Sequence, residues 1–118
     1  MKIGLILVTL FSMVIAGQMY ALDGKYQCTV AGEEIIANYN NTVKCVDIDV
    51  SGLFYKKNCD NINYKLYTNN TIELYNYNDC FSGAISSLEM SYNPDNNVVN
   101  VVAVVEGESE KCDLDYIS

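Results

Sequence analysis

Residues 62–74, INYKLYTNNTIEL, combine two runs of alternating apolar and polar side chains with a polar turn between them. Alternation with a period of two is typical of a β-strand with one buried face, so this stretch predicts a β-hairpin. A three-residue loop at 68–70 gives each side chain a partner of its own kind. The predicted pairs are Leu66 with Ile72, Tyr64 with Leu74, Lys65 with Glu73 and Tyr67 with Thr71. A two-residue loop would pair apolar with charged side chains, so we expect the longer loop, with Asn70 left-handed.

The same alternation continues along the rest of the chain, with breaks rich in Asn, Gly and Asp and without helical periodicity. The predicted strands are 25–31, 34–39, 43–50, 52–55, 62–67, 71–77, 85–92, 97–105 and 111–117. Short strands joined by turns predict an all-β fold, a small antiparallel meander that forms either a barrel or a sandwich. Residues 97–105, NVVNVVAVV, leave little polar face, which indicates a strand covered on both sides or one whose second face meets a ligand or partner.

The N-terminus has the features of a cleaved secretory signal peptide. Lys2 precedes an apolar run at 3–16, and small residues follow at Ala16, Gly17 and Ala21. The run is shorter than the roughly 20 residues that a membrane-spanning helix needs. We therefore predict a signal peptide at 1–21, a single domain at 22–118 and a secreted, extracellular product. Cleavage after Ala16 remains an alternative.

The five cysteines all follow this leader, so in an exported chain they are expected to form disulfides. Cys28 and Cys112 lie in the first and last predicted strands, where a bridge would close a barrel. Cys59 and Cys80 flank the central hairpin and would clamp its base. Cys45 is left over; it is either a buried inert thiol, a reactive thiol or the link of a disulfide-bonded dimer.

Asn40 and Asn69 each begin an Asn-x-Thr sequence on a predicted turn, where an acceptor side chain is accessible. Both are candidate glycosylation sites, which predicts a glycoprotein in a host that glycosylates. The alternative interpretation is that paired asparagines simply favour turns.

The composition restricts the function. The net charge of −8 opposes binding to nucleic acid and to anionic membranes. The chain has no His, so it lacks the Ser-His-Asp and Cys-His arrangements, and no cysteine spacing suggests a metal site. We therefore expect no catalysis, no metal and no cofactor.

Two binding functions remain, and the first is a small barrel that holds an apolar ligand. The residues expected to line it are Val98, Val102, Leu88 and Met90. The alternative is a secreted effector or inhibitor that binds a basic protein through an acidic, tyrosine-rich face. The candidate residues for that face are Tyr64, Tyr67, Tyr75 and Tyr77 on the hairpin, and Asp47 with Asp49 on another strand.

Two short stretches resemble known families. Gly24-Lys25-Tyr26 resembles the Gly-x-Trp opening of the lipocalins and is followed by a comparable strand meander. Residues 23–28 resemble the Gly-x-Tyr-x-Cys signature of immunoglobulin domains. Each match covers only a few residues, and neither assigns the chain to a family.

Overall fold

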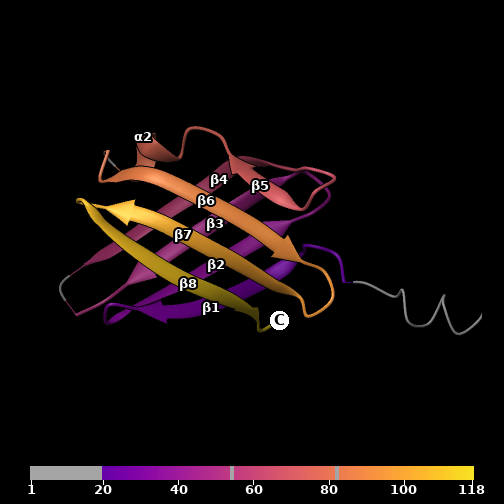
Figure 1. Cartoon of the computed structure of the whole chain (residues 1–118), viewed down its shortest axis with the longest axis horizontal. Helices are drawn as coiled ribbons and strands as arrows, with labels where there is room; N and C mark the ends of the chain where they lie inside the picture. The colour runs from indigo at the N-terminus through magenta and orange to yellow at the C-terminus, as the bar shows by residue number, and fades with distance from the viewer. Residues whose placement is uncertain (1–19, 54, 82) are drawn as a thin grey trace, which may run out of the picture.

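The computed structural model describes residues 20–53, 55–81 and 83–118, which form a closed antiparallel barrel (Figure 1). The strands are β1 (Gly24–Val30), β2 (Glu33–Asn40), β3 (Cys45–Ser51), β4 (Lys56–Leu66), β5 (Thr71–Leu74), β6 (Ile85–Asn93), β7 (Val98–Val105) and β8 (Glu108–Tyr116). They follow one another around the barrel in chain order, and β8 pairs with β1. The all-β fold class is confirmed, and of its two predicted forms the chain adopts the barrel.

The β4–β5 hairpin has the predicted register. Tyr64 pairs with Leu74, Lys65 with Glu73 and Leu66 with Ile72. Asn70, the last residue of the loop, has a φ of 69°, a conformation that asparagine tolerates better than most residues.

The predicted break at 57–61 is wrong, because β4 runs through it. A β-bulge absorbs the irregularity: β4 carries one extra residue where the register shifts between Val46 and Ile48 of β3. Asn61 takes a φ of 57°, and its backbone N–H donates to Asp47 Oδ1 at 2.7 Å. Of the strand predicted at 52–55, the described residues 52, 53 and 55 are not in a strand, and the Gly52 N–H donates to the carbonyl oxygen of Tyr55 at 2.7 Å.

Two other predicted boundaries are wrong. The strand predicted at 71–77 ends at Leu74 and gives way to a short helix, α2 (Tyr77–Phe81), which the strand pattern did not predict. The last strand begins at Glu108, earlier than predicted. Glu106 and Gly107 have φ values of 52° and 84°, which is the geometry of a tight two-residue hairpin turn, so pairing resumes at once.

The barrel is one closed sheet in which two of the ladders, called the seams below, are short. The β5–β6 ladder has two residue pairs, ending at Ile72 with Met90. The β1–β8 ladder also has two, Tyr26 with Tyr116 and Gln27 with Asp115. The ladders within β1–β5 and within β6–β8 are longer.

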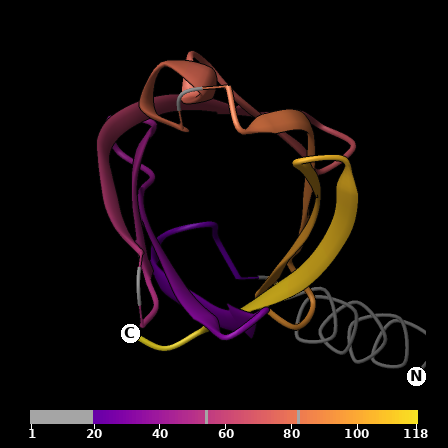
Figure 2. The same ribbon diagram turned by 90° about the vertical axis from the view of Figure 1, so that its left-hand side faces the viewer.

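The two disulfides have the pairing expected from the sequence, and one of them lies beside the β1–β8 seam. Cys28–Cys112 links β1 to β8 beyond the last paired residues of that ladder. Cys59–Cys80 ties β4 to α2, and Cys45 is the free cysteine. An end-on view shows the strands closing into a ring with α2 on the rim (Figure 2).

The predicted signal peptide lies outside the described residues except for Tyr20 and Ala21. In the described part of the chain, no helix is long and apolar enough to cross a membrane.

Candidate ligand-binding site

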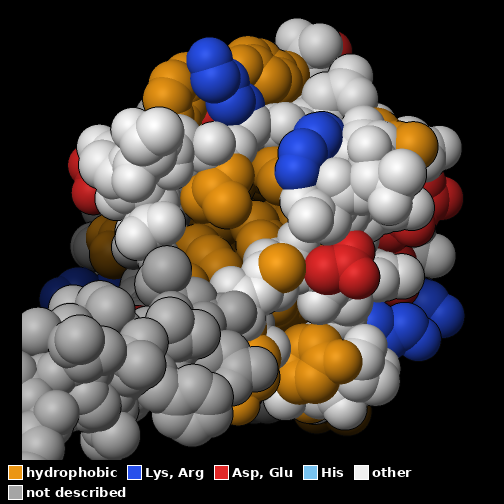
Figure 3. Space-filling view, turned by 90° about the vertical axis from the view of Figure 1, so that its right-hand side faces the viewer, with side chains coloured by type: hydrophobic (Ala, Val, Ile, Leu, Met, Phe, Trp, Pro, Cys, Tyr) orange, Lys and Arg blue, Asp and Glu red, His pale blue; other side chains and the backbone are white. Residues whose placement is uncertain are grey.

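One end of the barrel interior is filled by tyrosines. The ring centroid of Tyr39 lies 5.7 Å from that of Tyr26 and 5.1 Å from that of Tyr64, and Tyr92 lies 6.5 Å from Tyr26, all edge to face. Asn97 Oδ1 accepts hydrogen bonds from the hydroxyls of Tyr26 and Tyr92. Figure 3 faces this end and shows hydrophobic side chains at its centre, between the loops. The tyrosines therefore form a packed core at this end of the barrel.

The expectation that Val98 and Val102 line the interior is wrong. Val98 pairs with Asn93 and Asp115, and Val102 pairs with Glu89 and Lys111, so both valines are on the outer face of β7. Leu88 and Met90 do face inward, because they pair with Ala103 and Val101. Because both faces of β7 are largely apolar, its sequence shows little alternation and does not indicate which valines face inward.

A cleft of about 800 Å³ lies over β5, β6 and β7. It exists because β5 and β6 stop pairing at Ile72 and Met90, whereas the same register would continue with Glu73 opposite Glu89 and Leu74 opposite Leu88. The chain leaves β5 for α2 at this point, and the barrel wall opens. The cleft is lined by Tyr67, Asn69, Thr71, Ile72, Glu73, Leu74, Tyr77, Leu88, Glu89, Met90, Ser91, Asn100 and Val102.

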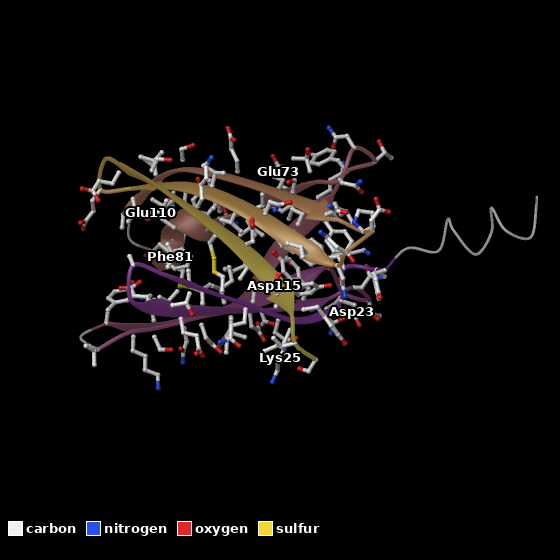
Figure 4. All side chains as sticks on the ribbon, turned by 60° about the horizontal axis from the view of Figure 1, so that its bottom comes forward. Asp23, Lys25, Glu73, Phe81, Glu110 and Asp115 are labelled. Carbon is white, nitrogen blue, oxygen red and sulfur yellow. A yellow bond between two sulfur atoms is a disulfide. The ribbon has the colours of Figure 1, made fainter. Side chains whose placement is uncertain are left out.

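The lining combines an apolar floor with acidic and aromatic walls. Ile72, Leu74 and Met90 are buried core residues that reach the cleft from inside the barrel. Glu73 and Glu89 are exposed on the outer face. In Figure 4, Glu73 lies on the opposite side of the barrel from Lys25. An apolar surface with a few placed polar groups is the usual composition of a small-molecule site.

The tyrosines at the cleft interact with Glu73. The Tyr67 hydroxyl donates to Glu73 Oε1 at 2.9 Å, and this bond is the main cause of the raised pKa of Tyr67. Lys65 Nζ lies 4.7 Å from the centroid of the Tyr67 ring, within cation–π range. Burial, followed by Glu73, raises the pKa of Tyr75. Tyr67, which lines the cleft, therefore already holds the Lys65 cation against its ring beside a carboxylate, although Lys65 itself is not a lining residue.

The structure separates the candidate residues that the sequence grouped together. Tyr67 and Tyr77 line the cleft, and Tyr75 is exposed next to Glu73. Tyr64 is part of the tyrosine core. Asp47 and Asp49 are on β3, which is not among the elements that form the cleft.

A second, smaller cleft of about 370 Å³ includes Asp47, Cys45, Asp23 and Asn61. Its carboxylates already have backbone partners: Asp47 accepts from Asn61 N and Asp23 accepts from Asn41 N. The interpretation of Cys45 as a buried apolar thiol is wrong. Cys45 is half-buried, pairs with Asn63 across β3 and β4, and places its Sγ 3.2 Å from Asn63 Oδ1.

Both candidate glycosylation sites are exposed near the tyrosine-filled end. Asn40 ends β2 and lines the smaller cleft, whereas Asn69 is in the β4–β5 loop and lines the larger one. Their use as acceptors stays a prediction.

The sequence reasoning missed Glu73, Glu89 and Asn100 as parts of a site. They are single polar residues on alternating strands, which is also the pattern of an ordinary solvent-facing surface. A signal that could have found them is the end of the alternation at Tyr75-Asn76, directly after β5 ends at Leu74. Comparison of the chain with protein-family models, with curated proteins and with solved structures found no match.

Proposed function

We propose that this chain is a secreted, non-catalytic binding protein whose site is the cleft over β5, β6 and β7. The ligand is amphipathic: an apolar body packs on Leu88 and Met90, and a positively charged group lies near Glu73 and Glu89. The observation that carries this proposal is the interrupted β5–β6 ladder, which brings inward-facing apolar side chains and outward-facing carboxylates into one cleft.

Three further properties support the proposal. The volume of the cleft is within the usual range of roughly 300–1,000 Å³ for small-ligand sites. The net charge of −8 attracts cations toward the surface and favours their encounter with the cleft. Two disulfides agree with maturation in an oxidising compartment, which supports secretion.

The proposal is tested by titrating the protein with a fluorescent long-chain alkylamine, and separately with the matching fatty acid. We expect the amine to bind more tightly, because the carboxylates favour a cation. Val102→Arg places a bulky cation in the cleft and should weaken amine binding at least tenfold. Val98→Arg is the matched control, since Val98 lies on the same face of β7 but outside the cleft. Equal binding by both variants, or equal binding of acid and amine, would refute the proposal.

A second candidate function is recognition of a basic protein, favoured by the exposed pair Tyr67 and Tyr75, which are 37% and 41% exposed on either side of Glu73. Tyr75 does not line the cleft. Tyr75→Ala should therefore reduce binding of a lysine-rich polypeptide and leave amine binding unchanged. Binding of the polypeptide that does not weaken in high salt argues against this second function, because salt screens exposed charges.

A further inference from the structure

The segment that precedes β1 is part of the barrel. Leu22 is only 2% exposed and belongs to the hydrophobic core. On one side of it, the Tyr20 N–H donates to the carbonyl oxygen of Pro94 at 3.0 Å. On the other side, Asp23 Oδ1 accepts from the Asn41 N–H at 2.8 Å. Residues 20–23 are thus held between the loop after β6 and the loop after β2.

We propose that the leader is cleaved after Ala16, so that the mature chain begins at Gly17 and keeps residues 20–23. This inference rests on the export included in the proposed function. The step is a hydrolysis: a leader peptidase adds water across the Ala16–Gly17 peptide bond, which leaves a carboxylate on Ala16 and an ammonium group on Gly17.

Cleavage after Ala21 conflicts with the contacts of this segment. It would remove the Tyr20–Pro94 hydrogen bond and the Ala21 carbonyl oxygen, which lies 3.4 Å from the Tyr26 hydroxyl. It would also place the new ammonium group on Leu22, a core residue, and a charge beside buried surface is costly. A terminal residue frays unless it is held in place, and the hydrogen bond of Tyr20 holds the outer side of Leu22.

The sequence around the two bonds agrees with this choice. Export leaders carry small residues at the last and third-last positions before cleavage. Ala16 and Val14 occupy these positions for the first bond, whereas Ala21 and the longer Met19 occupy them for the second.

The direct test is to express the whole chain in a secreting eukaryotic cell, remove glycans from the exported protein and determine its intact mass and N-terminal sequence. We expect a chain that begins at Gly17. An exported chain that begins at Leu22 overturns the cleavage site alone. A chain that remains in the cell with its leader attached overturns export as well, so the two failures are distinguishable.

The physical argument is tested with two forms released from a fusion partner, one beginning at Gly17 and the other at Leu22. The Leu22 form should melt at least about 5 °C lower, the shift expected from roughly 1 kcal/mol in a domain of this size. Leu22→Ala should lower the melting temperature more in the Gly17 form, where Leu22 is held in place. Leu114→Ala, at a residue that is also 2% exposed, should have the same effect in both forms. Equal melting temperatures, or equal effects of Leu22→Ala, overturn the inference.

Discussion

Asn97 connects two strands through the interior of the barrel. Its Oδ1 lies 2.6 Å from the Tyr26 hydroxyl of β1 and 2.7 Å from the Tyr92 hydroxyl of β6. It is 6% exposed and has a φ of 58°, so its environment and its backbone conformation are both specific. The sequence could not single out Asn97, because asparagine is abundant in the turns of this chain. Only closure of the barrel brings the hydroxyls of Tyr26 and Tyr92 together at Asn97.

Asn97→Ala is expected to lower the free energy of unfolding by about 2–4 kcal/mol, because two buried hydroxyls lose their acceptor and alanine disfavours positive φ. Urea unfolding monitored by circular dichroism measures the change. Asn97→Gly separates the causes, since it relieves the backbone without restoring the acceptor; near-native stability of this variant would contradict the role of the hydrogen bonds. Asn100→Ala, at an exposed residue of β7, is the control.

The buried tyrosines predict a loss of stability at high pH. Burial, with a smaller effect of the Asp23 charge, raises the pKa of Tyr64 to about 12, and burial also raises the pKa of Tyr39. An unfolded tyrosine has a pKa near 10 and ionises first, so the folded state binds more protons above that pH. Stability should be unaffected by these groups below about pH 10 and should fall by roughly 2–3 kcal/mol for Tyr64 alone by pH 12.

Unfolding curves from pH 8 to 12, combined with tyrosinate absorbance, measure this effect. Tyr64→Phe should reduce the slope of stability against pH. An unchanged slope in that variant would contradict the assignment.

At the scale of elements, alternation predicted each strand that has one apolar and one polar face. The β4–β5 register followed from side-chain pairing alone, because a shift of one residue would have turned apolar side chains to water. The break at 57–61 was mispredicted because a bulge at Asn61 lets a polar, turn-like sequence remain in a strand. The cleft was not predictable from periodicity, since it depends on where β5 ends relative to β6.

The two disulfides should differ in their contribution to stability. Cys28–Cys112 has a sequence separation of 84 and Cys59–Cys80 a separation of 21. Longer loops lose more entropy on closure, so removal should cost about 4–5 kcal/mol for the first and about 3 kcal/mol for the second. Paired Cys→Ser variants measured by chemical denaturation test the order; a larger loss from the Cys59–Cys80 pair would contradict it. Removal of the Cys59–Cys80 disulfide should also weaken amine binding, because this bond holds α2, and α2 carries Tyr77 at the cleft.

At the scale of the whole molecule, the cysteine pattern predicted the architecture well. Cys28 and Cys112 lie far apart in sequence on apolar rows, and the closed meander places them side by side. The environment of Cys45 was harder to predict from the sequence. Val43 and Val46 suggested an apolar environment, but Val46 faces the core whereas Cys45 faces outward beside Asn63.

The folded protein is expected to have one free thiol that reacts with an alkylating agent. Alkylation of the native protein, followed by mass spectrometry, should add one label at Cys45 because its Sγ lies at the outer surface. Reduction and unfolding should then allow four more labels, which brings the total to five. A native protein that takes no label, and whose mass is that of two chains until it is reduced, would instead show the disulfide-linked dimer.

The order of the strands also has a kinetic consequence. Every strand pairing except β1 with β8 joins neighbours in the sequence, so hairpins can form early and extend one at a time with little loss of chain entropy. We expect the last event to be the meeting of the two ends of the domain, where β1 and β8 share two ladder pairs and the flanking hydrogen bonds of Lys25 with Ile117 and Ser118. Refolding with Cys28–Cys112 already oxidised should therefore be faster than refolding of the reduced chain, because the slowest encounter has been made in advance.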